Sequence, residues 1–141
     1  MPKAAPDGST TLVDNEFVSL WFYPLPRILH HKIYKFLPAL PFQELLNTGV
    51  RHLQKYKATK WLGDNRENPV VSKENHEWAR AVWAPRALEA GFKYWATVMP
   101  SQAIGRLQLR MFIQEYEDLG VTVQTFDAVD DAFRWLQHVD M

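Results

Sequence analysis

The stretch FKYWATVM, residues 92–99, decides the fold of this chain. Apart from Lys93 and Thr97 it is hydrophobic on both alternating faces, and this is the pattern of a central strand that is covered on both sides. Segments whose apolar residues recur at helical spacing lie before and after it. A buried strand between two helices predicts a parallel sheet with helices packed against it.

The elements further toward the N-terminus follow from the same periodicities. Two runs rich in β-branched and aromatic residues, EFVSLWFY (16–23) and ILHHKIYKF (28–36), flank a proline-bearing break and predict a β-hairpin. Apolar residues then recur at helical spacing from Pro41 to Tyr56, which predicts a helix. ATKWLGD (58–64) is the third predicted strand.

The helix that comes before residue 92 contains a proline. Ser72 is placed to cap its start, and its apolar residues continue to Leu88. Pro85 has no N–H to donate to the carbonyl four residues earlier, so we expect it to kink the helix or split it in two. Gly91 is suited to end it.

The elements after residue 99 repeat the alternation. Ser101 is placed to cap a helix that reaches Leu119, and VTVQTF (121–126) is the last predicted strand. A final helix is expected from Asp127, as its cap, to Val139.

This order of elements, β-β-α-β-α-β-α-β-α, predicts an α/β fold. We expect a mixed, mainly parallel sheet of about five strands with an N-terminal β-hairpin and about four helices. Residues 1–13 are small, polar and without periodicity, which indicates a flexible N-terminal segment before a single domain over residues 14–141.

The composition argues against several classes of partner. Lys plus Arg and Asp plus Glu both number 16, so no overall field draws the chain to nucleic acid or to an anionic membrane. No apolar stretch approaches the roughly 20 residues needed to span a bilayer, and the first residues lack a signal peptide's apolar run. The chain has no cysteine, which excludes disulfides and fits a reducing compartment. We expect a cytoplasmic protein.

The most polar loop follows the third predicted strand, and ligands of open α/β sheets usually bind beyond the carboxyl ends of the strands. In this loop, residues 63–72, Asp64 could act as a base or acceptor, Asn65 as a hydrogen-bonding group and Arg66 as an anion fork. The alternative is purely structural: Asp64 and Asn65 form a turn, and Arg66 pairs with Glu67 or another surface acid.

Two tryptophans lie just after this loop. Trp78 and Trp83 flank the first half of the proline-containing helix, so one of them could wall a pocket with Arg66 at its mouth. The alternative is that they fill the space between the sheet and the helices.

The sequence contains no motif that is typical of a metal site or of a catalytic site. His30 and His31 are neighbours on one strand, so their side chains should point to opposite faces of the sheet. The other three histidines lie on three different predicted helices without the spacing of a helical ligand pair. No serine lies in a nucleophile motif, and no glycine-rich loop follows a strand. We therefore expect neither a metal nor a cofactor.

The helix that begins after Ser101 carries more apolar surface than one buried stripe requires. Ile104, Leu107 and Met111 lie on a different side from the stripe that should face the core. They could cover a neighbouring strand, or they could form a homodimer surface.

Several phrases of the chain resemble the SpoIIAA-like, or STAS-like, family of small bacterial proteins, and an uncharacterised branch of it in particular. These phrases are KWLGDNR (60–66), WxPRALxAGxKYWA (83–96) and AFRWL (132–136), and the resemblance covers residues 16–139. It implies the α/β fold and a binding surface around residues 63–72. In the STAS domains that antagonise anti-sigma factors, a serine just after an acidic residue is phosphorylated. Here Asn65 follows Asp64, and the next serine is Ser72.

The sequence leaves three functions open. The first is a non-catalytic STAS-like module that binds a protein partner or a small ligand around Asp64, Asn65 and Arg66. The second is a small enzyme with Asp64 as general base and Arg66 as anion clamp in a pocket. The third is a structural homodimer.

Overall fold

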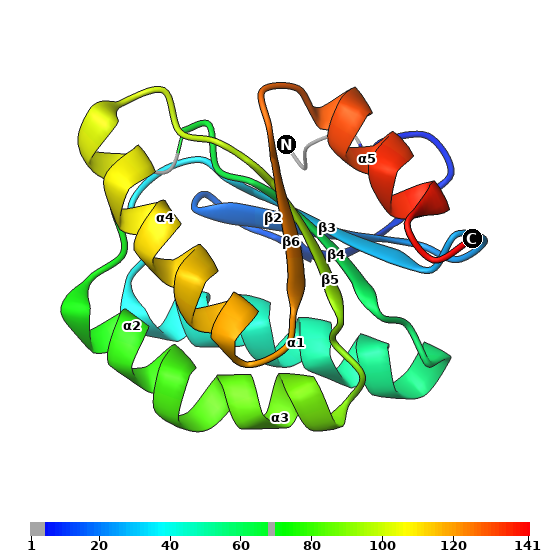
Figure 1. The fold of residues 1–141 in the computed structure, drawn as a ribbon, viewed down its shortest axis with the longest axis horizontal. Coiled ribbons are helices and arrows are strands. Elements are labelled where there is room, and N and C mark those ends of the chain that lie inside the picture. Colours follow the sequence, from blue (N-terminus) through cyan, green and yellow to red (C-terminus); the bar gives the residue numbers. More distant parts are fainter. Residues whose placement is uncertain (1–4, 68–69) are drawn as a thin grey trace.

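The computed structural model describes residues 5–67 and 70–141 as one mixed α/β unit (Figure 1). The strands are β1 (Thr10–Asp14), β2 (Val18–Tyr23), β3 (Ile28–Ile33), β4 (Lys60–Asp64), β5 (Tyr94–Val98) and β6 (Thr122–Phe126). The helices are α1 (Ala39–Tyr56), α2 (Lys73–Trp78), the π-helical segment η1 (Ala79–Trp83), α3 (Ala84–Glu89), α4 (Ala103–Asp118) and α5 (Val129–His138).

The six strands form one sheet in the order in which they occur in the chain. β1, β2 and β3 pair in antiparallel fashion, and β3 to β6 are all parallel. The predicted hairpin and the mainly parallel sheet are therefore confirmed. Each parallel pair is connected by helical structure, as a parallel crossover requires.

The first strand was not expected, and it makes six strands rather than five. β1 lies largely within residues 1–13, which the sequence indicated as a flexible segment, and pairs along the edge of the sheet with β2. Of its five residues Val13 alone is buried, and the register shifts between Thr11 and Val13. A short edge strand with one buried residue lacks the alternation that predicts a strand.

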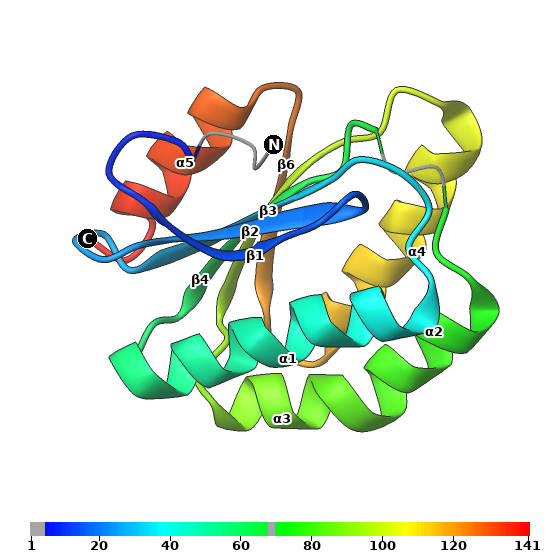
Figure 2. The same ribbon diagram turned by 180° about the vertical axis from the view of Figure 1, so that it is seen from behind.

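The helices divide unequally between the two faces of the sheet (Figures 1 and 2). α1, the α2–η1–α3 segment and α4 cover one face, and α5 covers the other. Successive side chains of β4 point to opposite faces of the sheet. Trp61 therefore belongs to the larger apolar cluster, and Leu62 belongs to the smaller one under α5. None of these helices is long and apolar enough for a membrane crossing, as far as the described residues go.

The helix with the internal proline stays helical from Lys73 to Glu89 instead of splitting in two, but a π-helical segment separates α2 from α3. Ser72 caps α2 by accepting a hydrogen bond from the backbone N–H of Asn75 at 3.1 Å. Before Pro85 the helix widens into η1, where the N–H of Ala84 donates to the carbonyl of Ala79 five residues earlier. This wider turn accommodates a residue that cannot donate. Gly91, with a φ of 106°, follows α3 in the left-handed conformation.

The two other predicted caps are wrong by one residue. α4 is preceded by Gln102 rather than Ser101, and α5 by Ala128 rather than Asp127, and neither helix start has a side-chain cap. The first turn of α5 instead contains Asp130 and Asp131, whose charges complement the helix dipole.

Candidate functional site

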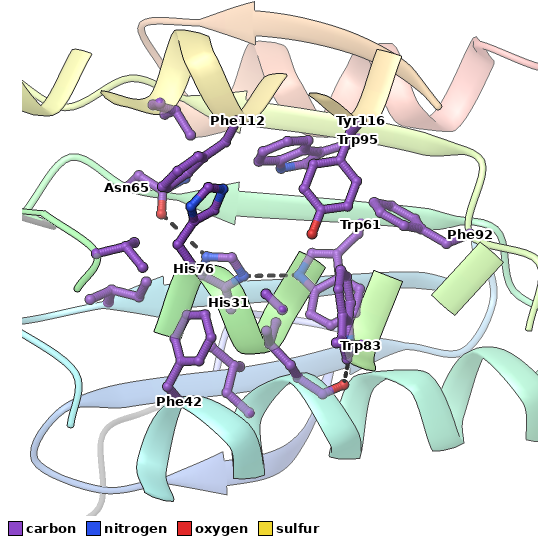
Figure 3. A pocket seen from close by; sticks show the side chains of 16 residues that line it. His31, Phe42, Trp61, Asn65, His76, Trp83, Phe92, Trp95, Phe112 and Tyr116 are labelled. Carbon is purple, nitrogen blue, oxygen red and sulfur yellow. Dashed lines mark hydrogen bonds between the residues drawn. The ribbon is translucent and has the colours of Figure 1, made fainter. Parts of the chain in front are cut away.

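A cavity of about 120 Å³ lies between the sheet and the helices α1, α2, η1 and α4. Figure 3 shows aromatic rings from both layers converging on it. It lies under one face of the sheet rather than beyond the carboxyl ends of the strands, where the sequence placed the site. Its aromatic walls are Phe42, Trp61, Trp83, Phe92, Trp95, Phe112 and Tyr116.

The aromatic walls hold one another in fixed orientations. Trp61 of β4 meets Trp83 of η1 edge to face, with ring centroids 5.7 Å apart, and meets Phe92 at 6.0 Å. The indole N–H of Trp83 donates to the backbone carbonyl of Leu46 on α1 at 2.8 Å. Such contacts fix ring orientation as well as burying area, so the cavity is preformed.

A directional chain of hydrogen bonds forms the polar side of the cavity. The indole N–H of Trp61 donates to Nδ1 of His31 at 2.9 Å, and Nε2 of His31 lies 3.4 Å from Oδ1 of Asn65. The amide of Asn65 donates to the hydroxyl of Thr97 at 2.9 Å. Burial lowers the pKa of His31 to about 4, so the ring is neutral at pH 7. Because Trp61 can only donate, the His31 proton is on Nε2, facing Asn65.

Two further groups lie at the α2 and α4 side of the cavity. His76 of α2 stacks on Phe112 of α4 with ring centroids 4.5 Å apart. Nε2 of His76 is also 2.8 Å from a carboxylate oxygen of Glu115, so the two helices are joined by a polar contact beside an apolar one.

Asp64 and Arg66 bind each other rather than facing the cavity. Nε and Nη2 of Arg66 donate to the two carboxylate oxygens of Asp64 at 2.9 and 2.7 Å, and the Arg66 backbone N–H donates at 3.3 Å. Asp64 is only 2% exposed. Burial acts to raise the pKa of Asp64, but the Arg66 hydrogen bonds outweigh it, and this pKa lies below its usual value. A carboxylate held in this way is a poor general base.

The structure therefore separates the residues that the sequence grouped together. Asn65 and Trp83 line the cavity, whereas Asp64, Arg66 and Trp78 do not. Trp78 packs against Phe42, at 6.1 Å between ring centroids. Within the predicted loop, residues 68 and 69 lie outside the described residues.

Among the cavity residues that sequence reasoning missed, His31 and Tyr116 matter most for the interpretation of the site. The sequence offers His31 only as a possible metal ligand, and Tyr116 lies in the apolar stripe by which the helix after Ser101 should face the core. The signal for His31 was its position two residues before the end of a buried strand, on the opposite face from His30. That separation is confirmed: His30 contacts Tyr23 on the α5 side, where the Tyr23 hydroxyl and Nδ1 of His30 are 3.0 Å apart. No group of three potential metal ligands occurs in residues 5–67 and 70–141.

The extra apolar surface of α4 is exposed. Ile104, Leu107 and Met111 are 66, 62 and 62% exposed. Of the two interpretations that the sequence left open, coverage of a neighbouring strand is therefore wrong for these three side chains.

Comparisons with protein-family models, with curated proteins and with solved structures found no match to this chain. The site must therefore be interpreted from its own geometry.

Proposed function

We propose that this protein is a non-catalytic, STAS-like binding module that takes a small, mainly apolar ligand into the cavity between the sheet and α1, η1 and α4. The observation that carries the proposal is the pairing of rigid aromatic walls with a fixed polar chain through His31 and Asn65. Ligand sites are typically concave and apolar with few, well-placed polar groups. The STAS-like part rests on the quoted sequence phrases and on the alternation of parallel strands with helices.

The size of the cavity limits the ligand. An engineered apolar cavity of about 150 Å³ stays dry and binds benzene, so a space of about 120 Å³ suits a molecule of one ring. The walls are too apolar for water to be held well, and an apolar ligand gains by filling the space.

Binding is favoured over catalysis by the state of Asp64. The enzyme hypothesis needs this carboxylate free as a base inside a pocket, but Arg66 occupies both of its oxygens and neither residue lines the cavity. The hypothesis of a protein partner at this loop is weakened because two of its three contact residues, Asp64 and Asn65, are only 2 and 4% exposed.

Filling the cavity from within tests the proposal. Ala79 lines the cavity on η1, while Ala81 of the same segment is exposed, so Ala79→Leu and Ala81→Leu form a matched pair. We expect toluene to raise the unfolding temperature of the wild type and of Ala81→Leu, because a ligand that binds only the folded state stabilises it. Ala79→Leu should lose this increase. An unfolding temperature that toluene and related apolar compounds leave unchanged in the wild type would contradict the proposal.

A homodimer through α4 is the second candidate, and a specific observation favours it. The exposed side chains of Ile104, Leu107 and Met111 form an apolar stripe. The same helix carries Arg106 and Arg110 in its first half and a group of acids in its last turns. Two antiparallel copies of α4 would bring opposite charges toward each other along the edges of an apolar contact, as an isologous interface allows.

A further inference from the structure

The hydroxyl of Tyr116 is a polar group directed into the cavity (Figure 3). The ring is fixed by edge-to-face contacts with Trp95, at 5.5 Å between centroids, and with Trp83, at 6.1 Å. The hydroxyl makes no hydrogen bond to any residue in the described part of the chain. A polar group that is partly buried without a partner is costly unless something else satisfies it.

This hydroxyl is a neutral donor under physiological conditions. Burial, with the neighbouring Glu115 carboxylate as a lesser cause, raises the pKa of Tyr116 well above its usual value. The phenol therefore keeps its proton and can donate it in a hydrogen bond.

Most other polar groups of the cavity are already engaged, although the indole N–H of Trp95 makes no hydrogen bond to a described residue. Trp61, His31 and Asn65 form a chain in which each donor has an acceptor. Nε2 of His76 faces Glu115. A ligand with one polar atom can therefore pair that atom with the Tyr116 hydroxyl, which is directed into the cavity (Figure 3).

The lining also restricts the charge of the ligand. Among the described residues that line the cavity there is no Asp, Glu, Lys or Arg. An ionised ligand group inside would lose its hydration without gaining a partner of opposite charge, which is strongly unfavourable. The flat faces and edges of the surrounding rings favour a ring of the same kind, because aromatic pairs gain energy beyond the area that they bury.

We infer that the cavity selects an uncharged, single-ring aromatic compound bearing a carbonyl oxygen, and that the Tyr116 hydroxyl donates a hydrogen bond to this oxygen. This inference rests on the proposed function and specifies its ligand class.

A double-mutant cycle between protein and ligand tests the assignment. The ligand pair is acetophenone and α-methylstyrene, which have the same shape but carry C=O and C=CH2 respectively. The protein pair is the wild type and Tyr116→Phe, and Tyr56→Phe removes a hydroxyl outside the cavity as a control. We expect the ratio of the two dissociation constants to change about five-fold in favour of α-methylstyrene in Tyr116→Phe, as for one hydrogen bond of about 1 kcal/mol. Tyr56→Phe should keep the wild-type ratio.

The infrared band of the acetophenone carbonyl gives a second readout that does not depend on how stable the variant is. With a 13C-labelled carbonyl, the band should lie at lower frequency in the wild-type complex than in cyclohexane, because a hydrogen bond weakens the C=O bond. A band at the cyclohexane position in the wild-type complex would overturn the role of Tyr116.

Each remaining outcome separates this inference from the proposed function. If both ligands bind but their ratio is the same in the wild type and Tyr116→Phe, the donor role is wrong while the binding function stands. If benzoate binds as tightly as acetophenone, the assignment of an uncharged ligand is wrong. If cyclohexyl methyl ketone binds as tightly as acetophenone, the assignment of an aromatic ligand is wrong. If none of these compounds binds, the proposed function itself falls.

Discussion

Buried neutral histidines make stability depend on pH at the scale of single residues. Burial lowers the pKa of both His30 and His31 to about 4. In the unfolded chain each would have a pKa of about 6.5, so protonation below that pH favours the unfolded state. The stabilising effect of the neutral rings is complete above pH 6.5 and is lost as the pH falls toward 4.

We therefore expect the free energy of unfolding to fall by about 3 kcal/mol per ring between pH 7 and pH 4. Urea titrations at several pH values measure this free energy. A free energy that stays constant over this interval would show that both rings accept protons freely in the folded state.

Removal of the ion pair between Asp64 and Arg66 should lower the stability of the protein without changing ligand binding. Arg66→Ala would leave the carboxylate of Asp64 buried at 2% exposure without its partner. We expect a loss of roughly 2 kcal/mol, because an unpaired buried charge is costly but the Arg66 side chain is itself 47% exposed.

Arg134→Ala is the matched control, because its pair with Asp131 is exposed on both sides and should contribute less than about 0.5 kcal/mol. Toluene binding by Arg66→Ala should equal that of the wild type, since Arg66 does not line the cavity. A loss of toluene binding in this variant would show that the ligand binds at the loop after β4 and not in the cavity.

Individual residues show where prediction of the site succeeded and where it could not. Asn65 was found because a polar residue after a buried strand is a recognisable signal. The separation of Asn65 from Asp64 and Arg66 follows from alternation along the extended chain, but which face holds the cavity depends on how α1 and α4 pack. Tyr116 could not be found, because an aromatic residue in a helical stripe has the same sequence pattern whether its hydroxyl faces solvent or a cavity.

At the scale of elements, α1 lies on the sheet at a distance that only glycine permits. A Cβ added at Gly49 would overlap the six-membered ring of Trp61. Since Trp61 is held by His31, Trp83 and Phe92, the ring cannot move without disturbing the cavity.

Gly49→Ala should therefore destabilise the protein by about 1–3 kcal/mol, despite the higher helix propensity of alanine. It should also weaken toluene binding, because displacement of Trp61 changes the cavity wall. Gln54→Ala, at an exposed position of the same helix, should change stability by less than about 0.5 kcal/mol. A Gly49→Ala protein as stable as the wild type would mean that α1 packs further from β4.

The elements were largely predictable because most of them bury a regular pattern. The parallel strands and α1 have strong periodicity, and the effect of Pro85 follows from its missing N–H. β1 was missed because it buries only Val13. The starts of α4 and α5 were misplaced because neither has a side-chain cap, so the nearby Ser101 and Asp127 were misleading.

At the scale of the whole molecule, the exposed stripe of α4 leads to a prediction about association. If two copies meet along this helix, sedimentation analysis should show a dimer, and Leu107→Asp should give a folded monomer, because a charge in an apolar interface is desolvated without a partner. Leu25→Asp changes a leucine that is 95% exposed in the turn between β2 and β3, and it should leave the dimer intact. A dimer that persists in Leu107→Asp would place the interface elsewhere.

The strand order of the sheet also determines how the molecule can be made. Because every strand pairs with the strand that precedes it in the chain, each new segment can dock onto structure that already exists during synthesis. During synthesis the β2–β3 hairpin leaves the ribosome before α1 and β4. Each strand can therefore pair with a strand that has already been made. Tyr116 emerges after all other cavity residues, so a nascent chain completes the cavity only when α4 has left the exit tunnel.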